Sequence, residues 1–443
     1  MSARARIHGA RHWKTGELVD VVIVAGVIEA VAPAGVLPER PEEARFDAEG
    51  AVLAPGLVDL HVHLREPGQG TKETIATGTR AAAAGGFTDV ACMPNTSPVL
   101  DEPARIEWVL NRAREAGHCR VHPIGAVTLG QLGEQLAPLL ALRDAGAAAF
   151  SDDGHPIASA EMMRRALEYA RPTGCPIVCH EEDPTLRGRG HMNEGAVSAR
   201  LGIRGIPAAA ETIMVRRDVE LAELTGGRVH LAHLSTAGSF ESLRDAHRRG
   251  LAVSGETCPH YWMLTDEAVE GYDTAAKMNP PLRSEADRQA TIAAIVDGTI
   301  DCLATDHAPH TAEEKAQPFD QAPFGIVGLE TALALTITGL VRPGHVTLER
   351  AIELWTDAPR RVFGLPRVAV EVGSPADLVL FDPDAEWTVE PERFHSKGRN
   401  TPFAGRTLAG RVLATWLAGA TTHVDPERER RLLAGKRSPV GAK

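Results

Sequence analysis

The stretch Leu57-Val58-Asp59-Leu60-His61-Val62-His63-Leu64-Arg65 decides the fold and points to the chemistry. Its apolar residues predict a buried strand. His61 and His63 are two positions apart, so their side chains point to the same side of that strand and both imidazoles can reach one cation. Histidines also occur in this spacing by chance. The pair therefore indicates a metal site only in combination with the residues at the ends of the other strands.

Seven further apolar runs follow, and longer segments with helical spacing lie between them, which is typical of β-α units on a parallel sheet. Eight strands are the number that closes a barrel. We therefore predict an α/β fold whose main part is a (β/α)8 TIM-type barrel. The predicted strands are Leu57 to Leu64, Thr88 to Met93, Arg120 to Val127, Ala147 to Ser151, Pro176 to Cys179, Arg228 to His233, Ala252 to Glu256, and Asp301 to Ala304.

A second, smaller part is predicted from the two ends of the chain. Residues 1–53 carry short β-type runs broken by Gly and Pro, and β character returns after Phe363. We predict that residues 1–53 and 367–425 together form a small β-sandwich domain, that residues 54–366 form the barrel, and that residues 426–443 are a flexible tail. Within the barrel, Ser159 is predicted to cap a helix with Met162, Met163, Ala166, Leu167 and Ala170 on one face.

Composition excludes several classes of partner. The chain has 443 residues with 47 Lys+Arg against 59 Asp+Glu, a net charge of −12, which disfavours nucleic acid and anionic membrane surfaces. No apolar run approaches the roughly 18 residues of a membrane span, and the polar start is unlike a signal peptide. We predict a cytoplasmic protein. Its six cysteines form no C-x-x-C pair, which indicates reduced, mostly buried thiols.

Metal-ligating side chains follow several of the predicted strands. His180 comes after the fifth strand, His233 after the sixth and Asp306 after the eighth, and the pair Asp152-Asp153 follows the fourth. In an α/β barrel all of these strand ends meet at one mouth. Four imidazoles and two carboxylates suit zinc but exceed the ligands of one four-coordinate ion, so two ions that share a carboxylate are predicted.

Four motifs resemble those of the dihydroorotases in the amidohydrolase superfamily, most closely the bacterial type I enzymes. The resemblance extends to Gly373-Ser374-Pro375-Ala376-Asp377-Leu378 and so covers essentially the whole chain. It implies an amidohydrolase barrel and a hydrolase of cyclic amides in pyrimidine biosynthesis. The motifs are Asp59-x-His61-x-His63-x-Arg65, Met93-Pro94-Asn95-Thr96, Glu256-Thr257-Cys258-Pro259-His260, and Ala304-Thr305-Asp306-His307-Ala308-Pro309-His310.

The resemblance also implies a set of ligands for two Zn²⁺ ions per subunit, bridged by Asp153 and a hydroxide. It assigns His61, His63 and Asp306 to the first ion and His180 and His233 to the second. Many relatives bridge the ions with a carboxylated lysine, but no lysine occurs here between positions 72 and 277, so an aspartate is needed. Spacing alone leaves Asp152 and Asp153 open. The matching subgroup uses the second aspartate, and Asp152 would then orient a neighbour or cap the loop.

The same resemblance implies roles for the remaining residues. Asp306 is expected to take the proton of the attacking hydroxide and deliver it to the leaving nitrogen. The substrate's free carboxylate is expected to bind Arg65, Asn95 and His310. The amide edge of the ring is expected to contact Asn279 and the main chain at Phe324 and Gly325. Between His310 and Phe324, residues 311–320 are polar and show no clear helix or strand period, which predicts a mobile lid or binding loop.

Two other functions are possible for such a chain, and two kinds of association are compatible with the enzyme. A hydantoinase or allantoinase shares the fold, but the missing bridge lysine and the Arg65, Asn95 and His310 set oppose it. A non-catalytic partner of aspartate carbamoyltransferase is opposed by the complete ligand set. Homodimer formation, or association of an active enzyme with that transferase, stays open. His230, three positions before His233, is expected on the opposite face of its strand as a packed or helix-facing residue.

Overall fold

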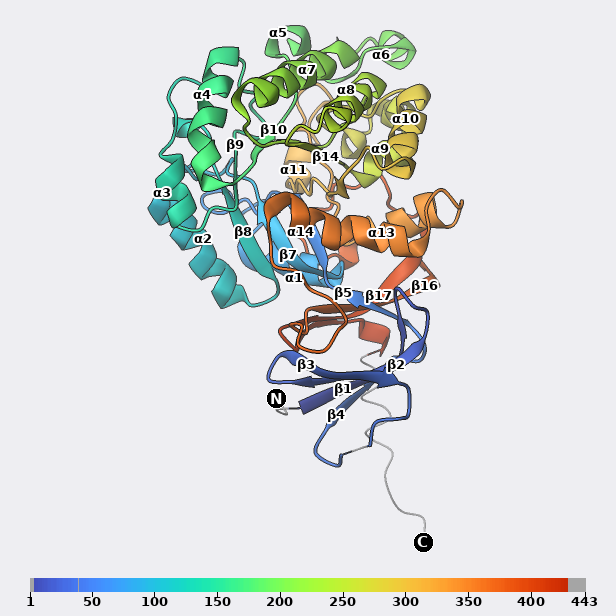
Figure 1. The fold of residues 1–443 in the computed structure, drawn as a ribbon. Helices are drawn as coiled ribbons and strands as arrows, with labels where there is room; N and C mark the ends of the chain where they lie inside the picture. The colour runs from blue at the N-terminus through green and yellow to red at the C-terminus, as the bar shows by residue number, and fades with distance from the viewer. Residues whose placement is uncertain (1–3, 39, 429–443) are drawn as a thin grey trace.

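A ring of eight parallel strands forms the centre of the larger part of the molecule (Figure 1). The computed structural model describes residues 4–38 and 40–428, so the predicted tail at 426–443 lies outside the described residues from position 429 onward. An isolated bridge between Val62 and His307 joins the first strand to the chain after the last. The predicted barrel is confirmed. Its strands, in sheet order, are β6 (Leu57–Val62), β7 (Phe87–Cys92), β8 (Arg120–Gly125), β9 (Ala149–Ser151), β10 (Ile177–Cys179), β13 (Val229–Leu231), β14 (Val253–Thr257) and β15 (Cys302–Leu303).

Helices surround this ring, and the predicted cap at Ser159 shows why α4 (Ala160–Ala170) starts where it does. The Ser159 side chain accepts a hydrogen bond from the Met162 amide at the start of α4, and Met163 and Leu167 are buried on the face towards the strands. The helices around the ring are α1 (Ile75–Ala84), α2 (Pro103–Ala116), α3 (Leu139–Asp144), α4 (Ala160–Ala170), α7 (Ala208–Thr225), α8 (Ala237–Arg248), α10 (Glu285–Val296), α13 (Leu348–Trp355) and α14 (Asp357–Phe363).

Shorter elements complete the connections between these helices and the strands. They are α5 (Pro184–Arg187), β11 (Met192–Asn193), α6 (Ala196–Leu201), β12 (Gly205–Ile206), α9 (Pro259–Met263), α11 (Ala312–Lys315) and α12 (Ala332–Thr336), with the 3-10 turns η1 (Leu129–Gln131), η2 (Arg171–Thr173), η3 (Asp266–Tyr272), η4 (Thr274–Ala276) and η6 (Pro391–Arg393) and the π turn η5 (Ile337–Val341). In Figure 1 the short helices α5 and α6 lie at the end of the barrel away from the second sheet.

A second sheet is built from both ends of the chain, as predicted. Strand β16 pairs antiparallel with β5 and so joins the two halves in the order β18-β17-β16-β5-β1-β2-β3, with β4 beside β1. Its strands are β1 (Arg4–His12), β2 (Leu18–Val24), β3 (Val27–Pro33), β4 (Ala44–Asp47), β5 (Val52–Pro55), β16 (Leu378–Thr388), β17 (Thr407–Leu417) and β18 (Ala420–Val424).

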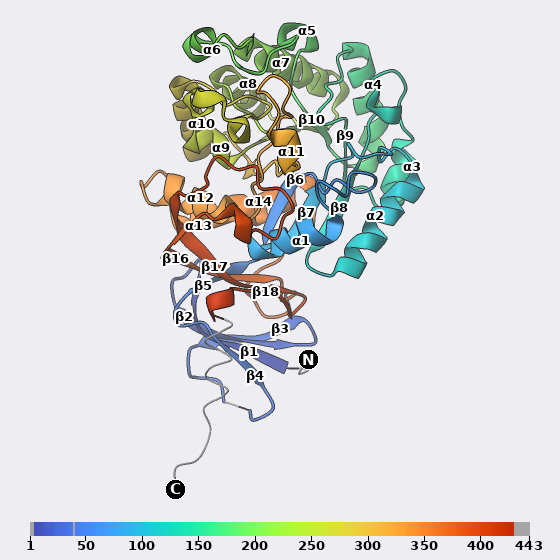
Figure 2. The same ribbon diagram turned by 180° about the vertical axis from the view of Figure 1, so that it is seen from behind.

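The sheet and the barrel are packed together over α1 and α12, seen from behind in Figure 2. Val379 and Phe381 of β16 belong to the same buried apolar cluster as Phe87 and Trp355 of the barrel. The Thr415 hydroxyl on β17 donates to a main-chain carbonyl oxygen of α1, 2.7 Å away. The sheet therefore supports the barrel directly.

Two expectations drawn from composition can be compared with the structure. All six cysteines are buried and unpaired. Among the described residues, no helix is both long enough and apolar enough to cross a bilayer.

Candidate metal centre and substrate cavity

The predicted ligands come together at the carboxyl ends of the barrel strands, which we call the mouth. All of them are buried, and they come from several different strand ends: His61, His63, Asp153, His180, His233 and Asp306. The backbone bends sharply at three positions there, with positive φ angles at Arg65, His233 and Asp306 of 62°, 37° and 47°. Non-glycine residues adopt this region at a cost, and such strain concentrates at functional sites.

Asp153 lies at the centre of the group. Its Oδ1 atom is 3.4 Å from His61 Nε2 and 3.6 Å from both His180 Nδ1 and His233 Nε2, and its Oδ2 atom is 3.6 Å from His63 Nε2. Burial alone would raise the pKa of this carboxyl group, but the charge of His61 and the contacts with His180 and His233 hold it well below the usual range. Asp153 is therefore an ionised carboxylate shared by four imidazoles.

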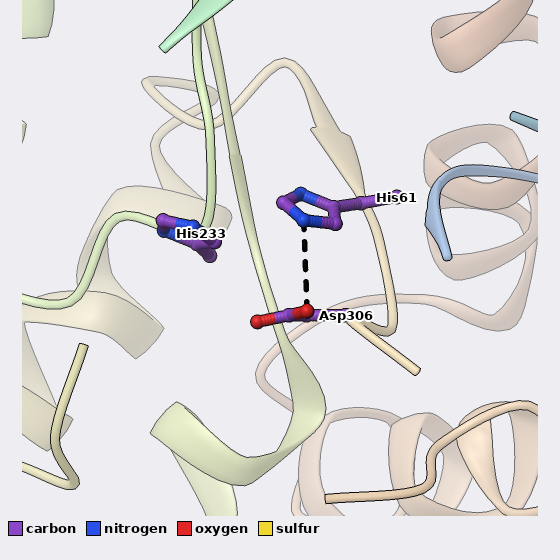
Figure 3. Close-up of side chains that lie close together, drawn as sticks. All are labelled: His61, His233 and Asp306. Carbon is purple, nitrogen blue, oxygen red and sulfur yellow. Dashed lines mark ion pairs between the residues drawn. The ribbon is translucent and has the colours of Figure 1, made fainter. Parts of the chain in front are cut away.

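Asp306 faces the same space from the loop after β15. Its Oδ1 atom is 3.1 Å from His63 Nε2 and 3.5 Å from His61 Nε2. Figure 3 marks the contact between His61 and Asp306 with a dashed line and shows the His233 ring beside these two side chains. The neighbouring histidines hold the pKa of Asp306 below its usual value despite the opposing effect of burial. This carboxylate can accept a proton from a group placed between it and the imidazoles.

Three buried polar atoms of the group have no hydrogen-bond partner, namely His61 Nε2, Asp153 Oδ1 and His233 Nδ1. An unsatisfied buried polar atom costs about 1–3 kcal/mol, so such atoms call for a bound group. Three overlapping sets place their ligand atoms within 4.8 Å of one another, and nitrogen and carboxylate oxygen are the donors that zinc accepts. The residues fit metal binding. The sets are His61, His233 and Asp306; His61, His63 and Asp153; and Asp153, His180 and His233.

Asp152, the alternative bridge, is directed away from the imidazoles. Its Oδ1 atom accepts hydrogen bonds from the amides of Val127 and Thr128, at 2.9 and 3.1 Å, and the Thr128 hydroxyl donates to its Oδ2 atom. This carboxylate organises the loop after β8. Asp153, by contrast, has the free oxygen that a bridge needs.

The sequence did not predict that the His61 imidazole is held in place by Glu256. The Nδ1 atom of His61 is 2.9 Å from Glu256 Oε1, and the other oxygen of Glu256 is 3.1 Å from His230 Nε2. His230 Nδ1 in turn is 2.8 Å from the Ser254 hydroxyl. Burial would raise the pKa of Glu256, but the bonds with His230 and His61 lower it to about 2. His230 is thus fully buried and contacts a carboxylate, which agrees with the packed alternative of the two expected for it.

A cavity of about 600 Å³ opens beside this centre. All six residues predicted to contact substrate line it: Arg65, Asn95, Asn279, His310, Phe324 and Gly325. Arg65 Nη2 is 3.4 Å from His310 Nε2, and Arg65 Nε donates to a carbonyl oxygen at 3.2 Å, so the guanidinium is held in one orientation. Burial, helped by the charge of Arg65, lowers the pKa of His310 to about 3, so its imidazole is neutral.

Two of these residues also contact the predicted metal ligands. Asn95 Oδ1 is 2.9 Å from His63 Nδ1, and Asn279 Nδ2 is 3.1 Å from His180 Nε2. The hydrogen bond to Asn95 leaves Nε2 of His63 directed towards Asp153 and Asp306. A hydrogen bond to the ring nitrogen that does not bind the metal fixes the tautomer and the ring orientation of a metal-binding histidine. The cavity wall and the candidate metal centre are therefore joined by hydrogen bonds.

Comparison with known proteins adds independent findings. A family model described as Dihydro-orotase-like matches residues 50–239. The chain is 54% identical over 413 residues to the dihydroorotase of Anaeromyxobacter dehalogenans, which covers 93% of this chain and 94% of that protein. It is 52% identical over 406 residues to the dihydroorotase of Pelotomaculum thermopropionicum, with 92% and 94% covered.

Solved structures of similar fold carry the names hydantoinase and dihydropyrimidinase. The L-hydantoinase (dihydropyrimidinase) from Arthrobacter aurescens superposes with a TM-score of 0.84 at 25% identity, covering 94% of this chain and 95% of that one. The dihydropyrimidinase from Brevibacillus agri gives 0.81 at 24% identity, with 94% of each chain covered. At these identities the likeness concerns the fold.

Proposed function

The chain belongs to the dihydroorotase family of the amidohydrolase superfamily, and on that premise we propose that it interconverts N-carbamoyl-L-aspartate with L-dihydroorotate and water, a step of pyrimidine biosynthesis in the cytoplasm. It is an enzyme, a hydrolase of cyclic amides. The observation that carries the proposal is the convergence of six buried histidines and aspartates beside a cavity walled by Arg65, Asn95 and His310.

Two zinc ions are the proposed cofactor. His61, His63 and Asp306 would hold one and His180 and His233 the other, with Asp153 shared. The unpartnered atoms of His61, Asp153 and His233 support this assignment. Zinc bound there would supply a Lewis acid that lowers the pKa of a water towards 7 and polarises a carbonyl group. An aspartate at the bridging position also supports placing the chain with the bacterial type I enzymes.

The chain's own residues account for binding and proton transfer. Arg65, with Asn95 and the neutral His310, binds the free carboxylate of the substrate through charge-assisted hydrogen bonds. Asn279 and the main chain of Phe324 and Gly325 meet the amide edge of the ring. Asp306 takes a proton from the attacking water and returns it to the ring nitrogen, and in the reverse direction the same carboxylate serves ring closure.

The test combines zinc content with two assays on the same purified protein. We expect two zinc ions per chain and hydrolysis of dihydroorotate that far exceeds hydrolysis of hydantoin. Asp306→Asn, which preserves shape but loses the base, is expected to lower kcat by about 10²- to 10⁴-fold. Faster turnover of hydantoin would instead make the chain a hydantoinase, and near wild-type turnover in the variant would remove Asp306 from the mechanism.

Association with other chains stays a prediction. A second copy of this chain and aspartate carbamoyltransferase are the two partners that the sequence resemblance suggests. The complete ligand set favours an active enzyme over a non-catalytic partner in either assembly.

A further inference from the structure

Two buried lysines lie behind the part of the cavity wall that Phe324 and Gly325 form. The chain has only seven lysines, and Lys277 and Lys315 are 2% and 9% exposed. Lysine is seldom buried without a partner that neutralises it. Among the described residues, neither amine forms an ion pair with a carboxylate. Their burial therefore needs another explanation.

Lys277 holds two carbonyl groups of the chain that precedes Phe324. Its Nζ atom donates to the carbonyl oxygens of Phe319 and Ala322, at 2.5 and 2.6 Å. The same ammonium lies 4.6 Å from the centre of the Phe324 ring, within the range of a cation–π contact. The carbonyl oxygen of Lys277 also accepts the amide of Gly325 at 2.8 Å. One residue thus contacts this segment from both its side chain and its main chain.

Lys315, the last residue of α11, holds the two carbonyl groups that flank Phe324. Its Nζ atom donates to the carbonyl oxygens of Pro323 and Gly325, each at 3.0 Å. Burial lowers the pKa of Lys315 to about 7 and that of Lys277 to about 8. Four carbonyl dipoles take the place of a counter-ion. In return, the lysines donate to these four carbonyl oxygens, of which that of Gly325 also accepts a hydrogen bond from Asn400 Nδ2 at 3.0 Å.

The held segment is the one that the proposed substrate must touch. The Phe324 ring has cation–π contacts with both Lys277 and Arg187, whose guanidinium carbon is 5.6 Å from the ring centre. Gly325 adopts φ of 148°, and a Cβ atom there would come within 2.6 Å of the Ala308 carbonyl oxygen. Its backbone therefore packs closely against the loop that carries His310. A small displacement of this segment would change the width of the cavity.

We propose that Lys277 and Lys315 are positioning residues that clamp residues 319–325, and so hold the Phe324 ring and the Gly325 main chain where the amide edge of the substrate binds. The inference rests on the proposed function for its substrate. It also modifies the expectation of a mobile lid at residues 311–320. Thr311 and Glu314 form a capping box that starts α11, and α11 places Lys315 under the wall.

Methionine variants test the clamp, because methionine keeps the unbranched apolar stem and removes the three donors. For Lys315→Met and Lys277→Met we expect KM for dihydroorotate to rise about tenfold, as for a lost hydrogen bond of ordinary strength, while kcat changes little. Zinc content should remain at the wild-type level, because neither lysine contacts a predicted ligand. Amide hydrogen exchange across residues 316–326 should accelerate about tenfold or more.

Lys14→Met is the matched control, since Lys14 is exposed in the turn between β1 and β2, its amine lies near Glu349 and Glu353 of α13, and it does not line the cavity. It should change neither KM nor exchange. Because replacement of the fully buried Lys277 also risks folding, Lys315→Met is the deciding variant. Unchanged KM and unchanged exchange in a folded Lys315→Met protein would overturn the clamp. Wild-type protein without dihydroorotate turnover would refute the proposed function instead, and the exchange measurement would still test the clamp.

Discussion

Glu256 shows how one side chain can hold a proposed metal ligand in place without itself belonging to the proposed ligand set. One of its oxygens contacts His61 and the other His230, so both acceptors are used. Glu256→Gln replaces one acceptor by a donor, and one histidine then loses its partner. Loss of such a contact typically weakens metal binding 10- to 100-fold, and we expect a decrease in zinc affinity of about that size. Competition with a chromophoric chelator measures it directly.

The control for this variant is Glu285→Gln, which removes an exposed carboxylate on α10. Its zinc affinity should equal that of the wild type. If Glu256→Gln also binds zinc with wild-type affinity, the Glu256 contact does not orient His61, and the pairing with His230 serves packing alone.

At this same scale, residue spacing predicted a gathering of ligands but not their support. The interval between His61 and His63 and the positions after the other strands predicted a gathering of imidazoles and carboxylates, and the resemblance to the dihydroorotases then assigned six predicted ligands among them. The choice between Asp152 and Asp153 depends on which carboxylate turns back to the β8 loop, and neighbouring positions do not reveal that. Glu256 lies at a strand end within one of the four motifs, but its contact with His61 joins β6 to β14 and has no local signature.

Among the elements, the strands were predicted best because each is a short apolar run between helical segments. Alternation along a strand applies only as far as the strand continues. Strand β13 ends at Leu231, and the backbone at His233 then turns to φ of 37°. The relation between His230 and His233 therefore could not be obtained from a period of two residues. Helix α11 was missed for a similar reason, since its four residues are too short for a period.

Ion pairs around the buried carboxylate of Asp89 link three elements of the barrel and predict a pH dependence of stability. Asp89 of β7 accepts from Arg360 of α14 at 2.7 Å and contacts His122 and Arg120 of β8 at 2.9 and 3.2 Å. Burial would raise the pKa of Asp89, but His122, Arg360 and Arg120 depress it well below the usual range. Stability from a depressed pKa is present above the unfolded value of about 3.9 and is lost as the pH falls through the folded value.

Asp89→Asn should therefore lower the free energy of unfolding at pH 7 by about 3–5 kcal/mol, because Arg360 is left buried without its counter-charge. The loss of stability between about pH 5 and pH 2 should be smaller than in the wild type, since the titrating group is gone. Urea denaturation at several pH values measures both effects. Asp144→Asn, at an exposed position on α3, is the control. A variant with the wild-type pH dependence would show that Asp89 does not carry the effect.

For the molecule as a whole, the second sheet and the barrel share one apolar cluster, and this predicts that they unfold together. Phe381 of β16 is fully buried in the cluster that contains Phe87 and Trp355. Phe381→Ala should cost about 3–5 kcal/mol and lower the melting temperature of the entire chain, with loss of bound zinc and of activity in the same transition. Calorimetry and an activity assay along one temperature series check this. Val372→Ala, at a position 65% exposed, should leave the transition unchanged. Two resolved transitions, with activity retained after the first, would mean that the sheet is a separate unit whose packing does not support the metal centre.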